Sequence, residues 1–137
     1  MSSVPVTVFF YGLFMDAEAL REKGLHPLNS RQASVAGLCL RIGRRATLVP
    51  DPAGRVHGFV IGLSQQELEQ LYAEPGVAEY QPDPVIAQLA DRSLVPALCF
   101  NLPPSQATAE ANPEYAAKLR ALAGRLGLPA DYVASIQ

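Results

Sequence analysis

The apolar stretch at the start of the chain constrains the fold most, because it ends at a glycine and leads directly into a helix-like segment. Residues 4–15 are mostly apolar, and those from Val6 to Tyr11 are β-branched or aromatic, as expected of a largely buried strand. Gly12 then permits backbone conformations and close approaches that a side chain would block. Residues 16–23 carry acids near their start and bases near their end, which predicts a short helix.

This strand, turn and helix together form a candidate anion site. A strand that ends in a glycine turn before a helix leaves several backbone N–H groups unpaired at one place. Such donors suit a carboxylate or a phosphate group. A buried strand followed by an ordinary turn gives the same pattern, so the segment alone leaves both interpretations open.

Composition indicates one globular domain, expected over residues 1–137. Hydrophobic residues make up 49% of the chain and charged residues 18%, without a signature of disorder. The net charge of −2 argues against a nucleic-acid surface, which needs a clustered basic face. No apolar run approaches the roughly 20 residues that span a bilayer. Residues 1–5 lack a basic region, so we expect no secretory signal and a cytoplasmic protein without membrane contact.

No residue pattern points to a metal or another cofactor. Cys39 and Cys99 show no motif spacing and lie among apolar neighbours, as do buried thiols in a reduced cytoplasm. His26 and His57 have no second histidine, cysteine or carboxylate at ligand spacing. A P-loop, a dinucleotide-binding glycine pattern and a serine nucleophile elbow are also absent from the sequence. We therefore expect no cofactor, and either a monomer or a homodimer.

The remaining apolar segments predict several strands and few helices. The turn-rich residues 50–54 predict a hairpin between the extended segments on either side. Such an order indicates an α+β domain whose mixed or mostly antiparallel sheet can curl into a barrel. The expected extended segments are 33–42, 46–49, 56–63, 77–89 and 94–102.

Two helices carry clear start signals. Ser64 and Glu67 form a capping box, and a proline eight residues after Glu67 ends that helix. Asn112 followed by Pro113 starts the clearest helix, which Gly127 ends. We expect this C-terminal helical segment, 112–136, to pack on the rest of the domain.

Three segments, 8–15, 55–64 and 71–80, resemble motifs of one superfamily in their order and spacing. The first is similar to an opening strand with a Tyr-Gly-Ser/Thr-Asn/Leu loop, and the second to a central hairpin strand with a Val-Xaa-Gly. The third is similar to a Leu-Asp-Xaa-Xaa-Glu-Gly segment followed by a tyrosine. The chain therefore resembles the γ-glutamylcyclotransferase-like superfamily, which includes plant avirulence-induced proteins and many small bacterial proteins. The resemblance implies a compact mixed or antiparallel β-barrel with flanking helices and a cavity beside the first loop.

The resemblance also implies an acyltransferase activity. In this family the α-amine of a γ-glutamyl group attacks its own γ-carbonyl, which releases 5-oxoproline and the departing amine. Such an enzyme holds the substrate carboxylate with backbone donors and uses one carboxylate to move a proton. Carried onto this sequence, the implied ligand is a small molecule with a carboxylate, and the implied binding residues are Tyr11, Gly12, Leu13, Phe14 and Tyr80.

The sequence departs from the family at the expected base. Aligning Leu71 and Gly76 with the motif places Pro75 where the catalytic glutamate belongs, and Glu74 one position earlier. A proline at this point re-aims the preceding residue, so Glu74 is our candidate catalytic base. A solvated loop acid is the competing interpretation of the same residue.

Further differences leave the activity open. Leu13 and Phe14 replace polar residues of the binding loop, and Phe100 stands where family members often carry a tyrosine. Arg44 and Arg45 are a possible source of positive charge for a ligand carboxylate. A cyclotransferase, a non-catalytic small-molecule-binding module on the same fold and a protein-interaction domain all remain compatible with the sequence.

Overall fold

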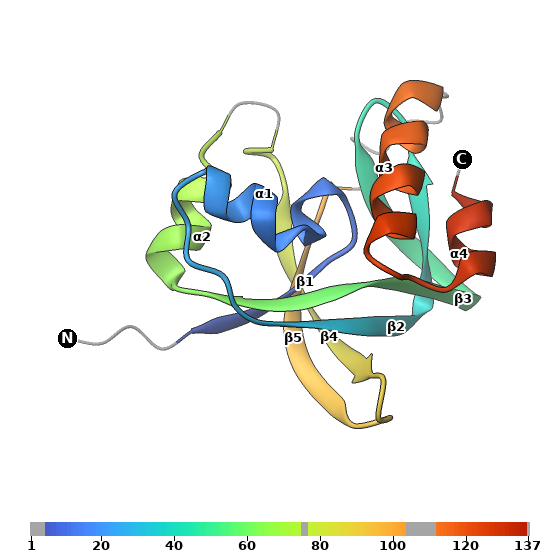
Figure 1. Ribbon diagram of the computed structural model, residues 1–137, viewed down its shortest axis with the longest axis horizontal. Coiled ribbons are helices and arrows are strands. Elements are labelled where there is room, and N and C mark those ends of the chain that lie inside the picture. The colour runs from blue at the N-terminus through green and yellow to red at the C-terminus, as the bar shows by residue number, and fades with distance from the viewer. Residues whose placement is uncertain (1–4, 75–76, 104–111, 137) are drawn as a thin grey trace.

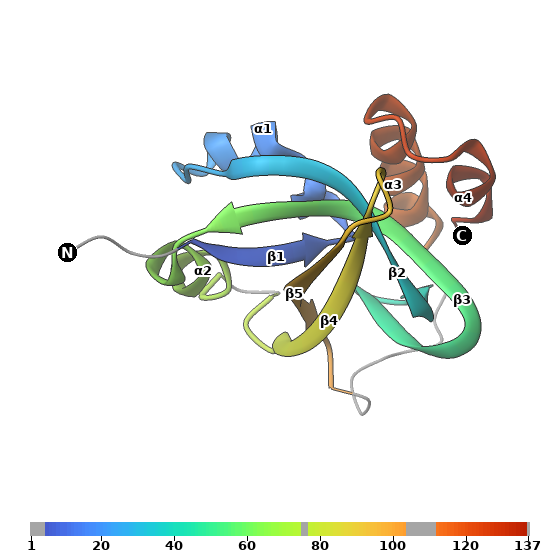
Figure 2. The ribbon, with the colours of Figure 1, turned by 90° about the horizontal axis from the view of Figure 1, so that it is seen from below.

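The computed structural model describes residues 5–74, 77–103 and 112–136, and its five strands close into a barrel with the order β1-β3-β2-β4-β5 (Figures 1 and 2). The first strand pairs antiparallel with β3 and parallel with β5, while β2–β3 and β4–β5 form antiparallel hairpins. The expected α+β barrel with flanking helices is confirmed. The strands are β1 Val6–Phe10, β2 Leu28–Ile42, β3 Ala46–Leu63, β4 Gln81–Leu89 and β5 Leu94–Asn101.

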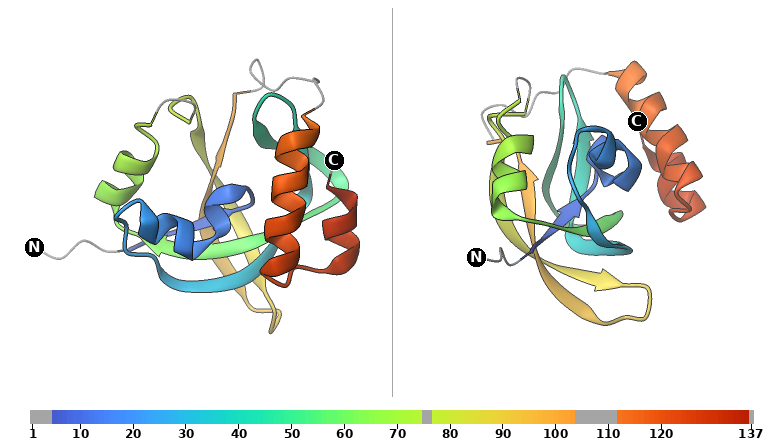
Figure 3. Two further views of the ribbon diagram at one scale, coloured as in Figure 1. Left: turned by 45° about the horizontal axis from the view of Figure 1, so that its top comes forward. Right: turned by 60° about the vertical axis from the view of Figure 1, so that its left-hand side comes forward.

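The helices cover the outside of the barrel, with α2 and the α3–α4 pair on opposite sides (Figure 3). Their bounds are η1 Leu13–Met15, α1 Ala17–Glu22, α2 Gln65–Leu71, α3 Pro113–Arg125 and α4 Ala130–Ser135. The predicted capping box is present, because Ser64 Oγ accepts from the Glu67 N–H and Glu67 Oε1 accepts from the Ser64 N–H. Within the described residues, no helix is long and apolar enough to cross a membrane.

The first strand is buried on both faces because it separates two hydrophobic clusters. Side chains alternate across a strand, so Phe9 packs with the barrel interior, including Val56 and Cys99. Val8 and Phe10 face the other way, into a cluster shared with helical residues that include Leu20, Leu68 and Leu119. This second cluster attaches α3 to the barrel wall. The extent of a single domain over 1–137 stays a prediction.

The predicted turn at residues 50–54 is wrong, since β3 runs continuously from Ala46 to Leu63 and pairs with β2 around a turn near Gly43. A bulge explains the difference. Pairing stops after Leu38 with Pro50 and resumes at Ala36 with Arg55, so the intervening residues of β3 need no ladder hydrogen bond.

Glycine makes this bulge possible. A Cβ at Gly54 would lie 2.4 Å from the Leu38 carbonyl oxygen, a distance that no side chain tolerates. Turn-forming residues therefore bend one long strand rather than connect two short ones. The fourth strand also begins later than expected, at Gln81, because residues 77–80 form a turn.

Candidate functional site

The turn that follows β1 forms one edge of a cavity. Gly12 precedes the short helix η1, and its carbonyl oxygen accepts a hydrogen bond from the Met15 N–H at 3.0 Å. The side chains of Leu13 and Phe14 are half-buried, and Met15 is buried in the core. The strand thus delivers Tyr11 and Gly12 to the cavity, while the core fixes the turn behind them.

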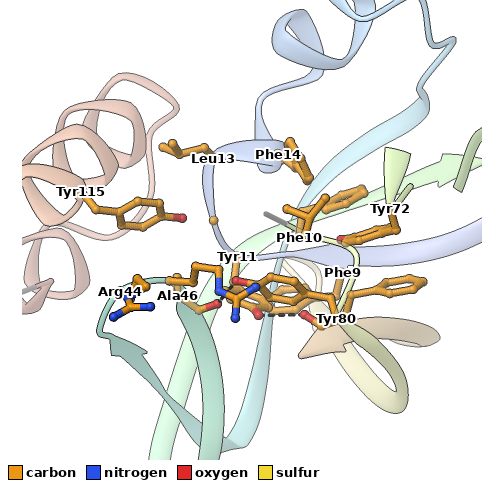
Figure 4. A pocket seen from close by; sticks show the side chains of 14 residues that line it. Phe9, Phe10, Tyr11, Leu13, Phe14, Arg44, Ala46, Tyr72, Tyr80 and Tyr115 are labelled. Atoms are coloured by element: carbon orange, nitrogen blue, oxygen red, sulfur yellow. Dashed lines mark hydrogen bonds between the residues drawn. The ribbon is translucent and has the colours of Figure 1, made fainter. Parts of the chain in front are cut away.

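The cavity has a volume of about 260 Å³ and is lined mostly by aromatic rings (Figure 4). Its walls come from six parts of the chain: the end of β1 with its turn, the β2–β3 turn, the end of α2, the turn at 77–80, β5 and the first turns of α3. The lining residues are Phe9, Phe10, Tyr11, Gly12, Leu13, Phe14, Arg44, Arg45, Ala46, Tyr72, Val77, Tyr80, Phe100 and Tyr115.

One wall of the cavity is a set of packed rings centred on Tyr72. Its ring stacks on Phe100 with 4.1 Å between centroids and 13° between planes. Phe14 meets Tyr72 edge-on at 6.1 Å, and Tyr80 lies at 6.2 Å. Offset and edge-to-face pairs of this kind fix ring positions as well as burying area. The wall is therefore rigid and apolar.

Two tyrosine hydroxyls of the cavity lining are directed to backbone oxygens. Tyr11 donates to the Phe100 carbonyl at 2.7 Å, and Tyr80 donates to the Ala46 carbonyl. Burial raises the pKa of Tyr11, Tyr72 and Tyr80 above the ordinary value of 10. All three phenols stay neutral at physiological pH, and for Tyr11 and Tyr80 the proton is already engaged within the protein.

The β2–β3 turn supplies the positively charged residues of the cavity lining. Arg44 and Arg45 both line the cavity. Arg45 Nη1 lies 2.7 Å from Glu79 Oε2, and this hydrogen bond from Arg45 lowers the pKa of Glu79. The side-chain amide of Asn112 donates to the Arg44 carbonyl at 3.3 Å, which ties the turn to the start of α3. Among the described lining residues none is acidic.

The proposed base, Glu74, lies beside the cavity but does not line it. Its two carboxylate oxygens are each 3.1 Å from Lys23 Nζ, which sits 5.6 Å above the ring centre of Phe14. The Glu74 side chain is 44% exposed, so the pair is in contact with water. Pro75, at the family's glutamate position, lies outside the described residues. A catalytic role for Glu74 stays a prediction.

The structure brings together the five residues predicted to bind a ligand, since Tyr11, Gly12, Leu13, Phe14 and Tyr80 all line one cavity. Their role in binding stays a prediction.

Sequence reasoning missed Tyr72 and Tyr115. Both follow helical patterns that predict a core position, and both do contact the core. The available signal was a hydroxyl on an otherwise aliphatic stripe, which needs a polar partner once buried.

Comparison with solved structures identifies the fold. A human protein, loc79017, has 18% identity and a TM-score of 0.79 over 97% of this chain and 88% of its own. A structure named gamma-glutamyl cyclotransferase also has 18% sequence identity and a TM-score of 0.79, and the match covers 98% of this chain and 89% of that chain. YkqA from Bacillus subtilis has 24% sequence identity and a TM-score of 0.75, and the match covers 95% of this chain and 52% of that chain. The chain thus has the small barrel fold of these proteins.

The family follows from the sequence pattern described as "Gamma-glutamyl cyclotransferase, AIG2-like", which matches residues 8–118. The chain belongs to this family, as its motifs predicted. No curated protein sequence matches it.

Proposed function

We propose that this protein binds a small molecule that combines a carboxylate with an apolar or aromatic body. The observation that carries the proposal is the ring-lined cavity of about 260 Å³ with Arg44 and Arg45 in its lining. An engineered apolar cavity of about 150 Å³ holds benzene, so this one has room for a ring and a short acidic chain. Apolar walls with a few placed charges are typical of small-molecule sites.

The charges and hydroxyls favour a simple carboxylate over an amino acid head group. Guanidinium groups pair well with carboxylates. The α-ammonium of a γ-glutamyl group, in contrast, needs an acceptor, and the described lining offers no carboxylate. The hydroxyls of Tyr11 and Tyr80 donate to backbone carbonyls rather than into the cavity.

Cyclisation of a γ-glutamyl compound is the second candidate function. In that reaction the α-nitrogen forms a bond to the γ-carbonyl carbon and the bond to the leaving nitrogen breaks. The α-ammonium gives up two protons, of which one ends on the leaving nitrogen and the other is taken up by the released amine or by water. Family membership supports it, and so does the place of Glu74 in the chain between two lining residues, Tyr72 and Val77. The Glu74 carboxylate would first have to leave Lys23.

Binding of 3-phenylpropanoate, measured by calorimetry, tests the first proposal. We expect binding by the wild type and none by 3-phenylpropanamide, which has the same body without the charge. Because a hydrogen bond to a charged group is worth about 1.5–3 kcal/mol, Arg44→Gln and Arg45→Gln should each weaken binding by about tenfold or more. Arg31→Gln, which changes an exposed arginine on β2, should leave the affinity unchanged.

Equal affinity for the acid and the amide would contradict the carboxylate site, and no binding of either would contradict the proposal as a whole. The same protein is incubated with L-glutamic acid γ-anilide, which carries an aromatic body on a γ-glutamyl head. Release of 5-oxoproline and aniline would favour the second candidate.

A further inference from the structure

One arginine of the cavity lining is paired with an acid that lies outside the lining. Arg45 Nη1 is 2.7 Å from Glu79 Oε2, and this ion pair connects the β2–β3 turn to the turn at 77–80. Arg45 lines the cavity, whereas Glu79 does not. The Arg45 side chain is 25% exposed and that of Glu79 is 46% exposed. The carboxylate is therefore the outer member of the pair, and the guanidinium lies between it and the cavity.

Neighbouring contacts keep this pair in place. The next residue after each member is also engaged, because Tyr80 donates its hydroxyl to the Ala46 carbonyl. The Tyr80 N–H donates to the Val77 carbonyl at 3.2 Å, which closes the turn that carries Glu79. One contact between side chains and one to the backbone thus hold the two turns together, so the carboxylate has a fixed position behind the arginine.

This arrangement places a negative charge beside the proposed carboxylate site. The hydrogen bond from Arg45 lowers the pKa of Glu79 below its ordinary value of 4.5, so Glu79 is ionised at neutral pH. A guanidinium carries its N–H donors in a planar fork, and one such group can serve two carboxylates. Two carboxylates on one guanidinium lie closer together than the Debye length of about 8 Å at physiological ionic strength, so salt screens their repulsion only in part. Every negative charge of a ligand bound at Arg45 meets this repulsion.

We infer that Glu79 sets the charge preference of the cavity: by opposing a second negative charge at Arg45, it makes the site select monocarboxylates over dicarboxylates and phosphate esters. This inference rests on the proposed function and narrows its class of ligand. Glu79 acts on the ligand through its charge and through Arg45, without lining the cavity itself, so it is a specificity-determining residue.

Three ligands that share a benzyl group separate the effect of charge from that of size. 3-Phenylpropanoate and the monomethyl ester of benzylmalonate each carry one negative charge at about pH 8, well above the pKa of a carboxylic acid, and benzylmalonate carries two. The ester is as bulky as benzylmalonate. We expect calorimetry to show that the wild type binds the ester at least as tightly as benzylmalonate.

Glu79→Gln tests the inference because it removes the charge and keeps an oxygen that can accept from Arg45. Its affinity for each monoanion should rise about fivefold and its affinity for benzylmalonate about 25-fold, since the lost, partly screened repulsion counts once for each ligand charge. Glu79→Asp keeps the charge and should keep the wild-type ratio of benzylmalonate to ester affinity. Glu18→Gln, a matched change of an ion-paired glutamate on α1 that does not line the cavity, should alter no affinity.

An equal change for the ester and benzylmalonate in Glu79→Gln would overturn the inference, and so would a wild type that binds benzylmalonate more tightly than the ester. Weaker binding of all three ligands by Glu79→Gln would also overturn it, because Glu79 would then only position Arg45. Each of these results leaves the proposed function standing, provided that the wild type binds 3-phenylpropanoate. Failure of the wild type to bind any of the three ligands would contradict the proposed function, and the inference with it.

Discussion

The ion pair between Glu74 and Lys23 bears on whether the Glu74 carboxylate is available for chemistry. The Glu74 carboxylate is the group on which cyclisation chemistry would depend, yet both of its oxygens contact Lys23 at the end of α1. Exposed pairs contribute little to stability, so the pair can open at small cost. Whether it does so in the presence of a ligand is the question that separates the two candidate functions.

We predict that Glu74→Gln and Lys23→Met each leave 3-phenylpropanoate affinity within about twofold of wild type, since neither residue lines the cavity. Each should lower the free energy of unfolding by less than about 1 kcal/mol, as measured by urea denaturation. A large loss of anilide turnover in Glu74→Gln, of about a hundredfold or more, would instead assign this carboxylate to proton transfer.

Helix α4 contacts the barrel through a pair of rings. Tyr132 meets His57 of β3 edge-on, with 4.9 Å between ring centroids. Within the described residues the Tyr132 hydroxyl is buried without a hydrogen bond of normal geometry, although the nearby His57 backbone moderates the rise of its pKa to about 12. Burial, reinforced by the charge of Arg55, lowers the pKa of His57 below 6.5.

This contact predicts a pH dependence of stability. Because the folded pKa of His57 lies below that of the unfolded chain, the unfolded chain binds more protons as the pH falls below 6.5. The free energy of unfolding should therefore be highest above that pH, fall as the pH drops through it, and level off below the folded pKa.

Urea denaturation between about pH 7.5 and 5.5 measures this effect in the range where histidine titrates. The variant His57→Phe keeps a ring against Tyr132 and should show a smaller loss of stability on acidification than the wild type. His26→Gln, at an exposed position, serves as the control. Equal losses in the wild type and His57→Phe would rule out His57 as the source.

The closed barrel isolates its interior from solvent. Cys99 on β5 is 0% exposed, and burial raises the pKa of its thiol to about 12. Cys39 on β2 is only half-buried, and both cysteines are free thiols. Since the thiolate is the reactive form, Cys99 can react only when the barrel opens.

We predict that Cys99 labelling reports global unfolding. In a Cys39→Ser variant, iodoacetamide should modify the remaining thiol at least about a thousandfold more slowly under native conditions than in the unfolded chain. The rate should rise with urea in step with the unfolded fraction seen by circular dichroism. Labelling that is fast without urea would show that the barrel opens locally, most simply along the β1–β5 seam, where pairing is shown only for Val8 with Leu98.

Local signals in the sequence predicted much of this structure. The Ser64–Glu67 capping box, the Asn112–Pro113 helix start and the buried first strand each depend on residues within a few positions of one another. The prediction of a turn at 50–54 failed because it depended on a contact with a distant strand. Its prolines and glycine fit a turn, and they fit equally well a bulge that exists only because β2 lies alongside.

The sequence by itself determined the family and the α+β barrel, because short motifs and alternating apolar positions encode them locally. It also picked out five residues that line one cavity, whose role in binding stays a prediction. Only the tertiary structure decided which distant residues meet at and beside the cavity, since Tyr115 reaches Gly12 and Lys23 reaches Glu74 from far along the chain. Contacts of this kind depend on how elements pack against one another, and packing is a property of the whole barrel rather than of any segment.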